Sequence, residues 1–419
     1  MRLRKWILFI GVNLLFCQCD KPDSDLPAIN NTVISSIAPI HGPYNTIDTI
    51  FGSGFDPNAA NDSVFFNGHY AKILEATSTR LIVQVPSLAG TGNVTVKINS
   101  ITTQGPVFKY DTTVYTSTLA GTGSAGFANG IGASASFNEP AGIVVDADGN
   151  VYVADNGNSA IRKITPDGVV STLYQSPTAL YGLVLAPDGN LYATDGNIYI
   201  WKITLTGVAS IFAGTNQDGP IDGPVHSAAF NRPIGIAVDA AGNFFIAESN
   251  SYIIRKISNG IVSTIAGMGV FGGTDGPALS AKFWLPRGIA VDSAGTIYIA
   301  DGNAHNIRKL SGGIVTTFAG STEPGYLNGI GTAARFGHLN SIYIDAFNNL
   351  LVPDIDNHNI RKITPDGTVT TFILYGVGDV DGPVPNASIR GPHFITYDKK
   401  GNGYFTEYFN HKVRKIEFK

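Results

Sequence analysis

The chain has 419 residues, of which only 14% are charged and 49 are glycine, a composition typical of β-rich proteins with many tight turns. Its formal net charge is −4, and removal of residues 1–18, which hold three basic and no acidic residues, lowers it to −7. This acidic balance argues against nucleic acid as a partner, because phosphate binding needs clustered basic side chains.

Residues 1–19 have the pattern of an export leader. Basic residues precede an apolar run at residues 6–16, which is too short to span a bilayer as a stable helix. The chain's two cysteines, Cys17 and Cys19, follow this run, and the segment resembles a bacterial lipoprotein signal. The resemblance implies lipidation, for which Cys19 is the better candidate, and a lipid as the only membrane anchor. An ordinary secretory leader with incidental cysteines is the alternative. No disulfide is expected in the exported part.

Residues 20–32 are polar and are expected to form a tether. Residues 33–110 alternate short apolar-polar runs with Gly, Pro and Asn turns, which predicts a small all-β sandwich. The pieces SSIAPIHGP, IFGSGF, VFFNG, LIVQVP and GNVTVKI are similar to an IPT/TIG immunoglobulin-like domain. The resemblance implies a spacer or interaction module, and the segment contains no cluster of catalytic residue types.

The rest of the chain, residues 111–419, repeats one unit six times. Its clearest copy is PRGIAVDSAGTIYIADGNAHNIRKLSGGIVTTFAG at residues 286–320, which predicts four short strands. A four-strand repeat with a period near fifty residues is typical of a β-propeller blade. The last copy lacks its fourth strand, and residues 114–121 (VYTSTLAG) are expected to supply it, closing a six-bladed ring. The shared pattern resembles NHL repeats.

Several polar residues recur in these copies and are interpreted as structural. An acid ends each second strand, and we expect it to cap its own turn by accepting backbone N–H bonds, rather than to form a ring of metal ligands or catalytic carboxylates: Asp155, Asp195, Glu248, Asp301, Asp354 and Glu407. An arginine recurs in five copies: Arg162, Arg255, Arg308, Arg361 and Arg414. Histidines follow three of the acids by four residues: His305, His358 and His411. Repetition accounts for these histidines better than a metal site does, and no metal or cofactor is predicted.

The copies differ in the loops before their first strands. Five carry a long segment in which Gly, then Ala, then, in four of them, Phe recur, and we expect most of each segment to pack between blades. The second copy lacks this segment and has Trp201 where the others have arginine. The missing loop predicts a notch beside Tyr181, Tyr199 and Trp201, aromatic residues suited to stacking on sugar rings. The alternative is that Trp201 and Tyr199 fill the space that the loop vacates.

The residue before the first strand's glycine also varies, and it predicts the ligand site. In chain order these residues are Ala141, Tyr181, Ile234, Arg287, Asn340 and His393. They should surround one mouth of the central channel, where a scaffold would not need Tyr, Arg, Asn and His on successive blades. Trp284, His338 and Arg390 lie on the same loops. If the protein is an enzyme, His393, Tyr181 and Arg287 are the candidates for base, acid and electrophile of a lyase.

The order of lipoprotein leader, IPT/TIG domain and NHL repeats resembles surface lipoproteins of Bacteroidetes. The resemblance implies an outer-membrane or cell-surface protein that binds polysaccharide or oligosaccharide, without catalysis, beside a TonB-dependent transporter. The alternatives are a polysaccharide lyase or hydrolase that uses the channel mouth, and a protein-interaction scaffold.

Overall fold

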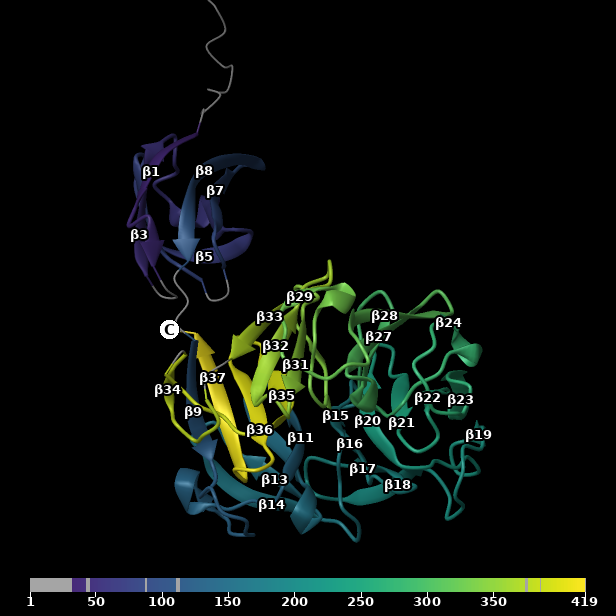
Figure 1. The fold of residues 1–419 in the computed structure, drawn as a ribbon. Coiled ribbons are helices and arrows are strands. Elements are labelled where there is room, and N and C mark those ends of the chain that lie inside the picture. Colours follow the sequence, from purple (N-terminus) through teal and green to yellow (C-terminus); the bar gives the residue numbers. More distant parts are fainter. Residues whose placement is uncertain are drawn as a thin grey trace, which may run out of the picture.

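The computed structural model describes residues 32–42, 46–86, 89–110, 114–373, 376–384 and 386–418, which form an all-β sandwich followed by a propeller (Figure 1). The predicted leader, including Cys19, lies outside the described residues. Within these ranges, no helix has the length and apolar character needed to cross a bilayer. The helical segments are single 3-10 turns: η1 (Ala59–Asn61), η2 (Gly132–Ser134), η3 (Asn156–Asn158), η4 (Ala278–Ser280), η5 (Gly302–Ala304) and η6 (Gly331–Ala333).

The sandwich contains eight strands in the order β1-β3-β6-β5-β4-β7-β8-β2. Their bounds are β1 (Val33–Ala38), β2 (His41–Gly42), β3 (Ile47–Ser53), β4 (Asp62–Phe66), β5 (His69–Ala76), β6 (Arg80–Gln84), β7 (Gly92–Ile98) and β8 (Ile101–Tyr110). Buried and more exposed residues alternate along β4 and β6, so every second side chain of these strands lies in the core. The core includes Phe66 and Phe108, whose rings meet edge to face at 5.0 Å.

The propeller has six antiparallel blades, each numbered by its copy of the repeat. Blade 1 contains β10 (Gly130–Ile131), β11 (Pro140–Val145), β12 (Val151–Asp155), β13 (Ala160–Ile164) and β14 (Val169–Gln175). Blade 2 contains β15 (Leu183–Leu185), β16 (Leu191–Thr194), β17 (Ile200–Ile203) and β18 (Ala209–Ala213). Blade 3 contains β19 (Gly223–Pro224), β20 (Pro233–Val238), β21 (Phe244–Glu248), β22 (Ile253–Ser258) and β23 (Ile261–Ala266).

The other three blades follow the same order. Blade 4 contains β24 (Gly276–Pro277), β25 (Pro286–Val291), β26 (Ile297–Asp301), β27 (Asn306–Ser311) and β28 (Ile314–Gly320). Blade 5 contains β29 (Gly329–Ile330), β30 (Tyr343–Ile344), β31 (Leu350–Asp354), β32 (Asn359–Ile363) and β33 (Thr368–Ile373). Blade 6 contains β34 (Gly382–Pro383), β35 (Pro392–Tyr397), β36 (Gly403–Glu407), β37 (Lys412–Phe418) and β9 (Val114–Ala120).

The ring closes as predicted. Strand β9, which precedes the first repeat, pairs antiparallel with the C-terminal β37 from Val114–Phe418 to Ala120–Val413. Figure 1 shows the two strands side by side although they lie at opposite ends of the propeller sequence. The six-bladed all-β fold is therefore confirmed, and the closure leaves blade 6 with the same strand content as its neighbours.

The long segments before the inner strands of blades 1, 3, 4, 5 and 6 form what we call the rim loops. Each contributes a two-residue strand (β10, β19, β24, β29 or β34) to the outer edge of its blade, which the sequence did not predict. Their phenylalanines Phe137, Phe230, Phe283 and Phe336 are completely buried. Phe336 packs among residues of blades 4 and 5, so these side chains fill the space between blades as expected.

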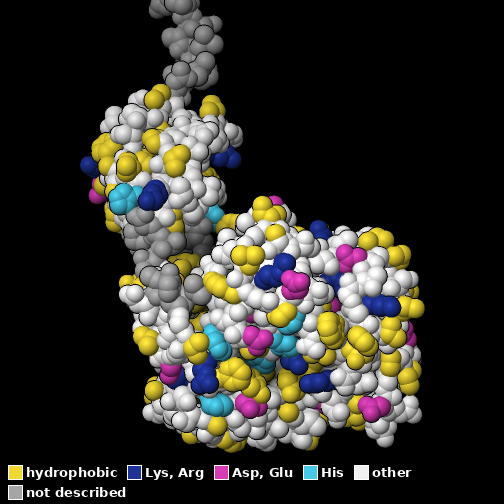
Figure 2. All heavy atoms as spheres, viewed as in Figure 1, with side chains coloured by type: hydrophobic (Ala, Val, Ile, Leu, Met, Phe, Trp, Pro, Cys, Tyr) yellow, Lys and Arg dark blue, Asp and Glu magenta, His cyan; other side chains and the backbone are white. Residues whose placement is uncertain are grey.

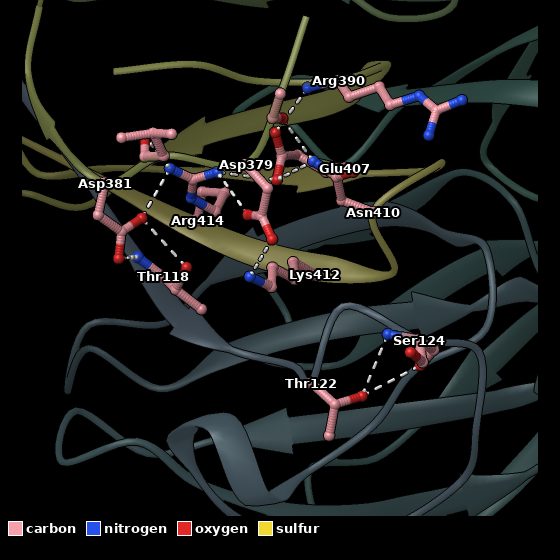
Figure 3. Close-up of polar contacts among 12 residues, drawn as sticks. Thr118, Thr122, Ser124, Asp379, Asp381, Arg390, Glu407, Asn410, Lys412 and Arg414 are labelled. Carbon is pink, nitrogen blue, oxygen red and sulfur yellow. Dashed lines mark hydrogen bonds and ion pairs between the residues drawn. The ribbon is translucent and has the colours of Figure 1, made fainter. Parts of the chain in front are cut away.

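Each rim loop is held by the buried arginine of its own blade. In blade 6, Arg414 pairs with Asp381 at 2.7 Å and with Glu407 at 3.0 Å (Figure 3). Asp381 in turn accepts hydrogen bonds from the backbone N–H and the hydroxyl of Thr118 on β9, at 2.9 and 3.1 Å. The network thereby links the rim loop, the closing strand and the C-terminal strand. The recurring arginines are rim-loop anchors, which explains why only blade 2, without a rim loop, lacks one.

The recurring acids serve the same loops, and the expectation that each caps its own turn is wrong for five of the six. Asp155 accepts the N–H of Asn138 at 2.7 Å, and Glu407 accepts that of Arg390 at 2.8 Å (Figure 3). Glu248, Asp301 and Asp354 likewise accept N–H groups of their rim loops. Only in blade 2, without a rim loop, does the acid cap its own turn: Asp195 accepts three N–H bonds at 2.9–3.0 Å.

The three aligned histidines link neighbouring blades. Nδ1 of His358 accepts the N–H of Gly391 at 3.1 Å, and Nδ1 of His411 accepts that of Glu139 at 3.1 Å. Nδ1–H of His305 donates to the carbonyl of Gly337 at 2.9 Å. Each bond runs to the loop before the inner strand of the next blade. These histidines therefore fix the loops that lead into the inner strands around the channel.

Candidate functional site

The six variable residues at the start of the inner strands, here called the mouth ring, begin the wall of the central channel. Four of them precede a glycine, which allows adjacent inner strands to approach closely: a Cβ on Gly235 would lie 1.9 Å from the carbonyl oxygen of Arg287. Ser341 and Phe394 take this place in blades 5 and 6. The hydroxyls of Ser249 and Ser341 donate to the carbonyls of Pro286 and His393 at 2.8 and 2.9 Å. Backbone contacts between blades therefore position the ring before any ligand is present.

Three of the predicted residues form one connected group. The guanidinium NH1 of Arg287 donates to Oδ1 of Asn340 at 2.8 Å. Asn340 also shares a hydrogen bond with the side chain of His338. Asn340 is 4% exposed, and Nε of Arg287 is buried without a partner. The amide thus holds one arm of the guanidinium and leaves other donors of Arg287 unused.

His393 and His338 are neutral imidazoles in this environment. Burial, reinforced by the positive charge of Arg287, lowers the pKa of His393 to about 3 and that of His338 to about 4. His393 is 5% exposed, shares a hydrogen bond with the backbone of Pro140 and leaves Nδ1 without a partner. Figure 2 shows histidine side chains gathered near the middle of the propeller face that it presents.

The ring of Tyr181 packs against Gly196 of its own blade. A Cβ on Gly196 would come within 2.4 Å of its ring, and Gly196 has φ +63°, so glycine is required there for both reasons. Tyr408, which the sequence prediction missed, packs on His393 with ring centroids 5.0 Å apart. Burial and a hydrogen bond to Glu139 raise the pKa of Tyr408. Tyr408 follows a recurring acid directly, at a position whose residue differs from blade to blade.

The other predicted aromatics lie away from the group around Arg287. Trp201 is half-buried in the layer between blades 1 and 2, where it contacts Tyr174 and Tyr199 at centroid distances of 6.3 and 6.2 Å. This is the space-filling arrangement considered as the alternative. Trp284 is 40% exposed on the rim loop of blade 4, beside Phe271 at 6.4 Å. The exposed Arg390 lies over Phe409 at 5.7 Å.

Below the mouth ring, the channel contains a cavity of about 320 Å³. Its lining comes from the inner strands and is mostly apolar: Ile143, Leu183, Ile236, Ile289, Ile342 and Ile395 belong to it. The cavity is thus next to the polar group rather than within it. A polar ligand group would find hydrogen-bond partners at the mouth ring and few below it.

Sequence models of known families match three parts of the chain. The IPT/TIG domain matches residues 32–110, the NHL repeat matches residues 137–164, and the teneurin NHL domain matches residues 270–358. Human NHL repeat-containing protein 2 is 26% identical over 308 residues, covering 64% of this chain and 42% of that protein. SUPPRESSOR OF QUENCHING 1 of Arabidopsis thaliana is 27% identical over 309 residues, covering 64% and 29%. The chain spans less than half the length of these relatives.

Solved structures share the whole two-part fold. A protein of unknown function from Bacteroides thetaiotaomicron aligns with a TM-score of 0.76 at 18% identity, over 93% of this chain and 98% of that one. A Bacteroides ovatus structure called an auxiliary nutrient binding protein has a TM-score of 0.60 at 19% identity and the same coverage. A putative phosphatase from Bacteroides thetaiotaomicron has 0.58 at 17%, over 93% and 97%. At such identities the likeness is one of fold. The chain therefore consists of an IPT/TIG domain followed by a six-bladed β-propeller of NHL repeats.

Proposed function

We propose that this protein binds a carbohydrate at the mouth ring without turning it over. The observation that carries the proposal is the connected group of Arg287, Asn340 and His338. Tyr181 is close enough to Arg287 to act on its charge, so an aromatic ring accompanies these polar groups. Sugar sites commonly combine an aromatic face with a few fixed polar groups. The name of the Bacteroides ovatus protein of the same fold, auxiliary nutrient binding protein, agrees with this proposal.

The histidine environment favours binding over catalysis. A general base works best with a pKa near the working pH, whereas burial lowers that of His393 to about 3. Such an imidazole accepts a hydrogen bond but takes up a proton poorly at neutral pH. A lyase or hydrolase mechanism that uses His393 as its base is therefore the less favoured function.

The setting that we propose is the cell surface. Lipidation at Cys19 would tether the chain, and the IPT/TIG domain would hold the propeller away from the membrane. The ring centroid of His69 in this domain lies 5.1 Å from that of Phe347, which belongs to a turn between inner strands. That turn is at the opposite end of the inner strands from the mouth ring, so the domain leaves the mouth uncovered. Capture beside a TonB-dependent transporter raises the local ligand concentration for uptake.

The test is affinity gel electrophoresis of residues 20–419 against a panel of polysaccharides, with the same mixtures analysed for new reducing ends and unsaturated sugars. We expect retardation without product, and weaker retardation for Tyr181→Ala. Asn340→Ala should weaken it as well, whereas exposed Tyr70→Ala in the IPT/TIG domain should not. Product formation would favour the lyase or hydrolase, and the absence of both retardation and product would favour a protein-interaction scaffold.

A further inference from the structure

Arg287 differs from the other deeply placed arginines of the propeller in having no acidic partner. Each rim-loop anchor forms an ion pair with at least one carboxylate: Arg162, Arg255, Arg308, Arg361 and Arg414. Among the described residues, Arg287 pairs with none and has only the neutral amide oxygen of Asn340. A partly buried guanidinium without a counter-ion is costly and is normally compensated by an anion.

The surroundings of Arg287 add positive rather than negative charge. Arg232, on the neighbouring blade, is close enough to disfavour the protonated form of Arg287 and, within the described ranges, also lacks a carboxylate partner. The acids on the same face are engaged elsewhere. Asp356 accepts the N–H of His338 at 3.0 Å, and Glu139 hydrogen-bonds Tyr408. Two arginines of the mouth, Arg287 and Arg232, thus form no ion pair with either of these carboxylates.

Arg287 keeps donors that no described residue accepts. Asn340 occupies NH1, and the other terminal nitrogen has no bonded partner among the described residues. Nε is unpaired as well, as it is in four of the five rim-loop anchors. The planar guanidinium fork matches a carboxylate or a sulfate group, which can accept two N–H bonds side by side. Nδ1 of His393, on the next blade but one, also lacks a partner among the described residues, but it is buried and is not counted as a ligand contact. The cavity beneath has a mostly apolar lining with few hydrogen-bond donors for a charged group, so an anion would bind at the mouth ring rather than in the cavity.

We infer that the ligand of the mouth ring is an acidic glycan whose carboxylate or sulfate group pairs with Arg287, in the field of Arg232. The inference rests on the proposed function and specifies its ligand class. A sugar ring of the same glycan would stack on Tyr181. The ion pair with Arg287 and the stacking on Tyr181 are then two separate contacts within one site. Uronic acids and sulfated sugars share this chemistry, and the experiment distinguishes them.

The experiment is isothermal titration of residues 20–419 with three size-matched oligosaccharides: oligogalacturonate, sulfated dextran oligosaccharide and neutral maltoheptaose. We expect at least tenfold tighter binding of one acidic probe than of maltoheptaose, and a tenfold or greater loss for that probe in Arg287→Gln. Arg287→Lys, which keeps the charge but not the fork, should recover only part of the loss. Arg232→Gln should weaken binding less than Arg287→Gln. Which acidic probe binds identifies carboxylate or sulfate as the recognised group.

Arg80→Gln is the matched control, because Arg80 lies in the IPT/TIG domain in an exposed pair with Glu75, at 3.2 Å, and its loss changes net charge equally. Unchanged melting temperatures confirm that the variants fold. Equal or tighter binding of maltoheptaose that depends on Tyr181 but not Arg287 would overturn the acidic-ligand inference and leave the proposed function standing. If acidic probes bind wild type, Arg80→Gln and Arg287→Gln alike, the assignment to Arg287 is wrong. If neither these probes nor the polysaccharide panel bind, the proposed function fails and the inference fails with it.

Discussion

Replacement of a single rim-loop anchor should destabilise the propeller substantially. Arg308 is completely buried and bonds four groups: the carbonyls of Lys282 and Thr274 at 2.8 and 3.1 Å, Asp275 at 2.6 Å and Asp301 at 3.5 Å. Methionine keeps the apolar stem and has no donors, so Arg308→Met removes all four bonds and leaves the space of the terminal nitrogens unfilled.

The magnitude follows from what remains behind. Removing one partner of a buried ion pair typically costs about 3–5 kcal/mol, and each buried carbonyl left without a donor costs about 1–3 kcal/mol. Two features moderate the loss: Asp275 is close to half exposed, and Asp301 still accepts the N–H groups of Trp284 and Leu285 at 2.7–3.0 Å. We therefore expect Arg308→Met to lower the free energy of unfolding by about 4 kcal/mol.

The assay is urea unfolding of residues 32–419 followed by tryptophan fluorescence. Of the chain's three tryptophans, only Trp201 and Trp284 are in this segment, and both report on the propeller. Arg335→Met is the control, since Arg335 bonds two nearby carbonyls and forms a 3.7 Å pair with exposed Glu323. It should cost less than 1 kcal/mol, as surface pairs do. A loss below about 1 kcal/mol for Arg308→Met would refute the anchor interpretation.

Three further perturbations test the site and its supports. Burial lowers the pKa of His393 to about 3, so the unfolded chain takes up its proton first and stability is lost as pH falls below 6.5. The loss of unfolding free energy between pH 7 and pH 5, from urea titrations, should be roughly 2 kcal/mol larger in wild type than in His393→Asn, and equal losses would contradict the burial argument. Gly196→Val should displace Tyr181 and weaken glycan retardation at least threefold, whereas unchanged retardation would remove Tyr181 from the site. His358→Ala leaves the Gly391 N–H without its acceptor and should lower the free energy of unfolding by about 1 kcal/mol, which an unshifted urea curve would disprove.

The repeat pattern was sufficient to predict the propeller and its closure. Alternating side chains and Gly-containing turns specify short antiparallel strands locally, as Asp239 illustrates by accepting the N–H groups of Ala241 and Asn243 at 3.0 and 2.8 Å. Comparison between repeats then separated shared residues from varying ones. The same position of each repeat lies at the same place in its blade, at the channel mouth. Variation at this position, including Arg287 and Asn340, therefore led to the prediction of a ligand site there.

The roles of the shared polar residues became clear from their contacts in the folded chain. The sequence places Asp155 beside its own turn, yet the carboxylate bonds a rim loop that begins more than twenty residues earlier, because burial leaves loop N–H groups that need an acceptor. Nor does residue spacing reveal that Arg287 has no counter-ion among the described residues while Arg308 has two, since both are arginines in buried surroundings. Local patterns in the sequence are enough to predict which elements form and how they repeat. Charge compensation and the occupancy of each donor depend on groups far apart in the chain, which only folding brings together.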